Sequence, residues 1–116
     1  MTKRKQKLVN GAIDLTKDTT SQQQPVHPKA LAAFQAGQGW LVTSAEEPLS
    51  RSYALDEALQ AFERALVFQP DFIDAHLWIA RLTQDRQTRR DHLEFILKRV
   101  PNHEEARRML DELGSL

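Results

Sequence analysis

The most regular pattern of apolar and polar positions lies in the middle of the chain. Apolar side chains recur there three and four residues apart, with charged or amide side chains between them: Leu55, Ala58, Leu59, Phe62, Ala65 and Leu66. This spacing places all of them on one side of an α-helix. The pattern therefore predicts a helix that begins near residue 55 and ends before Pro70, because proline disrupts a helix interior.

An earlier helix is predicted from Pro28 to about residue 43. Proline suits the first helical turn, and apolar residues follow at roughly helical spacing: Leu31, Phe34 and Leu41. Gly37 and Gly39 lie inside this segment, where each glycine costs about 1 kcal/mol relative to alanine. We expect their presence to reflect the close approach of another helix.

The segment TSAEEPLSRS, residues 43–52, interrupts the helical pattern with Pro48 and three serines, so it is predicted to be a loop. Beyond Pro70, apolar spacing predicts three more helices, at about 72–84, 88–99 and 103–113. The predicted fold class is all-α, with about five helices joined by short connections.

Residues 1–26 differ from the rest of the chain in composition. They are rich in Lys, Thr and Gln and contain few apolar residues. Such a segment cannot bury enough apolar surface to offset the entropy of ordering it. We therefore expect a flexible basic tail at 1–26 and a helical domain at 27–116.

Two prolines in the helical part have the same spacing to a following alanine. Pro70 and Pro101 are 31 residues apart, and each precedes an alanine by five positions, Ala75 and Ala106. In the segment ALQAFERALVFQP, four residues stand at relative positions 0, 4, 7 and 12: Ala58, Phe62, Ala65 and Pro70. This spacing resembles the second-helix signature of the tetratricopeptide repeat family. The resemblance extends over about residues 29–113 and implies a solenoid of antiparallel helix pairs, with two repeats and a C-terminal capping helix.

The chain departs from that family pattern between its first two helices. Roughly nine residues, within 44–54, look inserted there. A compact repeat does not need such an insertion, which makes it a candidate functional segment. Two repeats and a cap are also close to the lower limit for a stable solenoid, so a second copy or a partner chain is expected to cover part of the surface.

The resemblance implies a function as well. Tetratricopeptide repeats bind peptides or proteins in a groove lined by the first helix of each pair. Alignment places these residues in that groove: Phe34, Gln38, Leu41, Leu77, Arg81, Gln84 and Arg108. Arg81 and Arg108 would give it a cationic end, or they are simply solvated charges.

Aromatic residues divide between core and surface. Phe62, Trp78 and Phe95 fall on apolar helix positions and are predicted to be core. Four others are candidate anchors for a partner, although interhelix packing is the favoured explanation for them: Trp40, Tyr53, Phe68 and Phe72.

Charge and composition narrow the function classes. The chain has 16 basic and 16 acidic residues, so its formal net charge is zero, which argues against nucleic acid as the main ligand. The basic tail still leaves an RNA-associated role as a weaker alternative. No cysteine is present, and the cytoplasm is the default location. We expect neither a signal peptide nor a membrane span, because no long apolar run occurs.

Catalysis has little support in the sequence. The four histidines lie in different predicted elements without metal-ligand spacing, and no glycine-rich phosphate loop or nucleophile elbow occurs. We therefore expect no catalytic residues, no metal and no cofactor. The favoured function is a non-catalytic adaptor that binds a peptide or protein. The alternative is a structural subunit of a larger assembly or homo-oligomer.

Overall fold

The computed structural model describes residues 26–114. Within them it contains five α-helices and one 3-10 turn: α3 (Pro28–Glu46), η3 (Pro48–Ser50), α4 (Arg51–Phe68), α5 (Ile73–Leu82), α6 (Arg86–Arg99) and α7 (Glu104–Gly114). No strand occurs among the described residues. The predicted all-α class with about five helices is confirmed. Of the predicted tail, residues 1–25 lie outside the described part.

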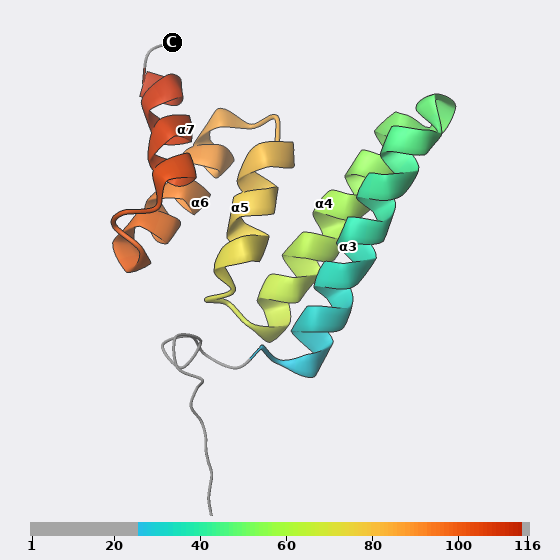
Figure 1. Cartoon of the computed structure of the whole chain (residues 1–116), viewed down its shortest axis with the longest axis horizontal. Coiled ribbons are helices and arrows are strands. Elements are labelled where there is room, and N and C mark those ends of the chain that lie inside the picture. The colour runs from blue at the N-terminus through green and yellow to red at the C-terminus, as the bar shows by residue number, and fades with distance from the viewer. Residues whose placement is uncertain (1–25, 115–116) are drawn as a thin grey trace, which may run out of the picture.

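The helices pack in chain order, each beside the next (Figure 1). Helices α3 and α4 form a long antiparallel hairpin, and α5 lies against α4. Helices α6 and α7 follow, so that α3 and α7 stand at the two ends of the row. Because α5 has 10 residues whereas α3 has 19, the far end of the hairpin projects beyond α5.

Side chains at the helix starts explain several boundaries. The Nδ1 atom of His27 accepts a hydrogen bond from the Lys29 backbone N–H at 3.0 Å, directly before Pro28. The carboxylate of Asp85 accepts one from the Thr88 N–H at 2.8 Å at the start of α6. These side chains satisfy backbone donors that have no partner within the helix.

The loop predicted at 43–52 is wrong. Helix α3 continues to Glu46 and α4 begins at Arg51, so only residues 47–50 connect them. The hydroxyl of Ser44 donates to the Leu41 carbonyl at 2.7 Å, a bond that fits inside the helix. Pro48 stands at the start of the 3-10 turn, after α3 has ended, where its missing N–H does no harm. Most of residues 44–54 therefore lie within the helical hairpin.

The core consists of two clusters that meet at α5. The first joins α3, α4 and α5 through these buried residues: Ala30, Ala33, Phe34, Ala58, Phe62, Ala65, Phe72, Ala75 and Ile79. The second joins α5, α6 and α7: Leu77, Ala80, Leu93, Ile96, Ala106 and Leu113. Helix α5 supplies residues to both clusters, so it holds the two ends of the row together.

The glycine prediction is confirmed at one position only. A Cβ atom built on Gly37 would lie 2.7 Å from the Phe62 ring, so this glycine allows α4 to pack closely on α3. A Cβ atom on Gly39 would meet nothing within 4 Å. Within the described chain, Gly39 has no close neighbour that explains it.

Candidate protein-interaction surface

The groove residues predicted on α3 have three different environments. Phe34 is 9% exposed and belongs to the first core cluster. Leu41 is half-buried and packs against the same cluster, whereas Gln38 is exposed. Only Gln38 and the uncovered part of Leu41 can therefore contact a partner without rearrangement of the core.

The groove residues predicted beyond α4 divide in a similar way. Leu77 is 7% exposed and lies in the second core cluster, on the opposite side of α5 from the first. Arg81 is half-buried, while Gln84 and Arg108 are exposed. Phe34 and Leu77 thus stabilise the domain, one in each cluster, and the polar members of the set provide its surface.

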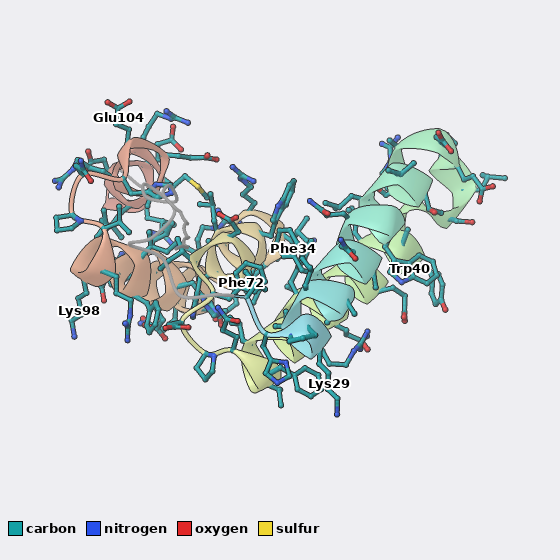
Figure 2. The ribbon with its side chains drawn as sticks, turned by 60° about the horizontal axis from the view of Figure 1, so that its bottom comes forward. Lys29, Phe34, Trp40, Phe72, Lys98 and Glu104 are labelled. Carbon is teal, nitrogen blue, oxygen red and sulfur yellow. The ribbon has the colours of Figure 1, made fainter. Side chains whose placement is uncertain are left out.

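Four aromatic rings connect the hairpin to α5. The Phe34 ring contacts the Phe72 ring with centroids 4.9 Å apart and the Phe62 ring at 5.2 Å. Phe62 in turn stacks on Trp78 at 5.7 Å. Figure 2 shows Phe34 and Phe72 close together between α3 and the start of α5. Phe72 is 8% exposed, so it packs in the core and is not an exposed anchor for a partner.

Arg81 ends this aromatic row and is tied to α7. Its guanidinium carbon lies 4.5 Å from the centroid of the Trp78 ring. Its Nε donates to Glu105 Oε2 at 2.8 Å, and Nη2 donates to Oε1 at 2.5 Å. This bidentate pair lowers the pKa of Glu105, chiefly through the hydrogen bond from Arg81. The positive charge of Arg81 is consequently compensated within the chain.

Arg108 lies in the same region without such a bidentate pair. It adds to the electrostatic lowering of the Glu105 pKa, so Arg108 lies near the carboxylate that Arg81 binds. The structure therefore brings these two predicted residues together. Arg81 and Arg108 were predicted to form a cationic end of the groove. Arg108, which is exposed, is the one that can attract an acidic group on a partner.

A pair of histidines joins α5 to α6. Nδ1 of His76 lies 2.8 Å from Nδ1 of His92, and Nε2 of His76 lies 2.7 Å from the Pro70 carbonyl oxygen. Burial is the largest cause that lowers the pKa of both rings. From the sequence, these two histidines were assigned to different elements, and no contact between them was predicted. However, both are eight residues from Gln84, the centre of the turn, and such residues face each other in an antiparallel hairpin.

Exposed apolar side chains gather at both ends of the α3–α4 hairpin. Near the connecting turn, Val42 is 55% exposed, Tyr53 is 60% exposed and Leu49 is fully exposed. At the other end, Phe68 is 38% exposed and is partly covered by the His27 ring, with centroids 5.9 Å apart. Tyr53 also makes an edge contact with Trp40, with centroids 5.6 Å apart.

Residues 26–114 lack two other kinds of feature. No group of three or more His, Asp or Glu side chains lies in a position to hold a metal ion in this part of the chain. No described helix combines the length and apolar character needed to cross a membrane.

Comparison of the chain with protein-family models, with curated proteins and with solved structures finds no match.

Proposed function

We propose that this protein is a small non-catalytic adaptor of tetratricopeptide type that binds a peptide or protein segment. Successive antiparallel helices and the Ala58, Phe62, Ala65 and Pro70 spacing support this relationship. The binding surface would run along one side of α3, α5 and α7.

The observation that carries the proposal is an apolar edge that the first core cluster leaves incompletely covered. Leu41 of α3 and Trp78 and Leu82 of α5 pack on that cluster, yet each keeps part of its side chain accessible. Partly exposed tryptophan and leucine side chains are typical anchor points for a peptide. Exposed Gln38 and Arg108 supply polar groups, so the favoured ligand is an apolar peptide segment with an acidic residue.

Selection from a displayed library of 12-residue peptides, with the full 116-residue chain as bait, would test this proposal. We expect the selected peptides to be apolar and acidic and to bind with micromolar affinity in calorimetry. Arg108→Glu should weaken binding about tenfold, because it places a negative charge beside an acidic ligand.

Glu63→Lys, on the exposed side of α4, is the matched control and should leave the affinity unchanged. Selected peptides that bind both variants as tightly as the unchanged chain would contradict the proposed surface. Failure to enrich any peptide would count against the adaptor function itself.

The second candidate is a structural role in a homo-oligomer. The outer side of α3 favours it, since no described element covers that side (Figure 1). We also propose a cytoplasmic location, consistent with the absence of cysteine from the sequence. Imaging of a fluorescent fusion would test it.

A further inference from the structure

The outer face of α3 is unusual for a helix in contact with water. This face is turned away from α4 and α5, and its exposed members are Leu31, Ala32, Gln35, Ala36, Gly39 and Val42. From Ala30 to Ala45 the helix contains no charged residue. The exposed side of α4, by contrast, carries Asp56, Glu63 and Arg64. A solvent-facing side is normally charged or polar, so the α3 outer face has the character of a contact surface.

Apolar side chains are accessible on this face as well. Leu31 is 40% exposed and Val42 is 55% exposed, near opposite ends of α3. They are 11 residues apart, which is close to three helical turns and keeps them on one side of the helix. A second helix laid along α3 would cover both.

Gly39 provides an independent reason to expect a second helix. A glycine inside a helix costs about 1 kcal/mol relative to alanine. Gly37 has a packing reason, because the Phe62 ring leaves no room for a Cβ atom there. The space beside Gly39 is open in the single chain. A second helix whose backbone approaches α3 closely from outside would explain Gly39 in the same way, because it would leave no room for a Cβ atom there.

Charges at the two ends of α3 indicate which helix that is. Lys29 lies in the first turn and Glu46 is the last residue, and both are exposed. Figure 2 shows Lys29 at the start of α3, where its Nζ lies 5.7 Å from the centroid of the Phe68 ring of α4. If a second α3 lies antiparallel to the first with its Gly39 against Ala36, the register that brings the two small exposed residues together, residues whose numbers add up to 75 face each other. Lys29 then faces Glu46 of the second copy, and Ala36 faces its Gly39.

We propose that the protein associates with a second copy of itself through the outer face of α3, with the two α3 helices antiparallel and closest at Ala36 and Gly39. A parallel pair would instead place Lys29 beside Lys29 of the second copy and Glu46 beside its Glu46. One helix from each copy buries less than the roughly 800 Å² per partner of a standard interface. The expected dimer is therefore weak, with a dissociation constant in the micromolar range. The inference does not depend on peptide binding.

Sedimentation velocity of the full chain, from about 5 to 500 μM, tests the proposal. The unchanged protein should shift from monomer to dimer over this range. Gly39→Gln should remain monomeric throughout, because the new side chain keeps the helices apart. The open space at Gly39 means that this variant still folds, which circular dichroism and its thermal midpoint at low concentration would verify.

Ala45→Gln is the matched control. It introduces the same side chain at an exposed position of α3 outside the proposed contact, so dimerisation should be unchanged. A chain that stays monomeric to 500 μM would overturn the proposal. So would a dimer that Gly39→Gln leaves intact.

Charge exchange tests the antiparallel arrangement. In a dimer of Lys29→Glu chains, or of Glu46→Lys chains, both facing pairs consist of like charges. Each variant should therefore weaken the dimer about three- to tenfold. An equal mixture of the two single variants should form heterodimers as strong as the original dimer, because every facing pair is then opposite in charge. Weak association in the mixture would contradict the antiparallel arrangement.

Discussion

Gly37 and Gly39 are two residues apart in α3 and have opposite surroundings. The first faces the fully buried Phe62 ring, and the second faces open space. Sequence alone predicts the same role for both, because it shows the helix and its glycines but not which side meets another element. Local spacing cannot supply that information.

We predict opposite effects for alanine at the two positions. Gly37→Ala should destabilise the fold by about 1–3 kcal/mol, because the added methyl group overlaps the Phe62 ring in a packed core. Gly39→Ala should stabilise it by up to about 1 kcal/mol through better helix propensity. Urea unfolding of both variants at low protein concentration measures the difference. Equal changes in the free energy of unfolding would contradict this account of the α3–α4 contact.

Arg81 illustrates how far the site could be predicted. The sequence places it correctly on the third predicted helix, with part of its side chain accessible. Its partner, Glu105, is 24 residues away on α7, and no local pattern links the two. The family resemblance predicted that Phe34 and Leu77 line a groove, whereas both are buried in the core, because the sequence does not determine how the helices are rotated against each other.

At the scale of elements, most helix ends could be predicted from the sequence, and one connection could not. Pro28 begins α3, and α6 ends directly before Val100 and Pro101, as the proline positions predict. Pro48 and three serines made residues 43–52 resemble a loop. In the structure, the Thr43 hydroxyl donates to the Gly39 carbonyl at 3.3 Å and Ser44 bonds the Leu41 carbonyl, so both side chains fit within α3.

The histidine pair makes the contact between α5 and α6 sensitive to pH. The Pro70 carbonyl can only accept, so Nε2 of His76 carries a proton and donates to it. In the neutral pair, Nδ1 of His92 then donates to Nδ1 of His76. If both rings become charged, two N–H groups face each other and this bond is lost. Asp71 and Asp91 favour protonation of the pair, while Arg99 opposes it.

We therefore predict that the free energy of unfolding falls as the pH drops below about 6.5, the usual histidine value. Because the folded-state pKa of both rings is lowered, the unfolded chain takes up protons first as the pH falls. The decline should level off below the folded-state pKa values. Urea unfolding from pH 8 to pH 5 measures the slope, and His92→Gln should reduce it. An equal slope in that variant would contradict the role of the pair.

Helix α7 is held by polar contacts as well as by the second cluster. Arg81 and Glu105 pair across α5 and α7, and Arg86 donates from Nη2 to the Leu113 carbonyl at 2.8 Å. The Arg81 and Glu105 side chains are 30% and 32% exposed, so water screens their attraction.

A double-mutant cycle of Arg81→Met and Glu105→Gln should give a coupling energy below about 1 kcal/mol. Hydrogen exchange in the single variants should increase in α7 and stay unchanged in α3. A coupling of several kcal/mol would show that the pair is far more buried than the structure indicates. Faster exchange throughout the chain would show that α7 does not open separately.

At the scale of the whole molecule, the two core clusters divide the row of helices into halves of different composition. The first cluster is dominated by alanine and aromatic residues, and the second by larger aliphatic side chains. Long hairpin contacts support α3 and α4, whereas α6 and α7 depend on the second cluster. The two halves can therefore open with different free energies.

Leu93→Ala should expose this difference. Leu93 is fully buried in the second cluster, and its truncation should cost about 2–5 kcal/mol. Native-state hydrogen exchange should then show faster exchange in α6 and α7 while the amides of α3 and α4 keep most of their protection. Uniform loss of protection would mean that the five helices unfold as one cooperative unit.

The position of α5 between the two clusters limits how its sequence can vary. Ala75 and Ile79 serve the first cluster, while Leu77 and Ala80 serve the second. Of its ten residues, only Asp74 is exposed. In a library of all single substitutions, α5 should accept the fewest replacements of any described helix, and Asp74 should be its one permissive site. The outer face of α3 would accept many in a folding screen, and fewer in a screen that also requires pairing.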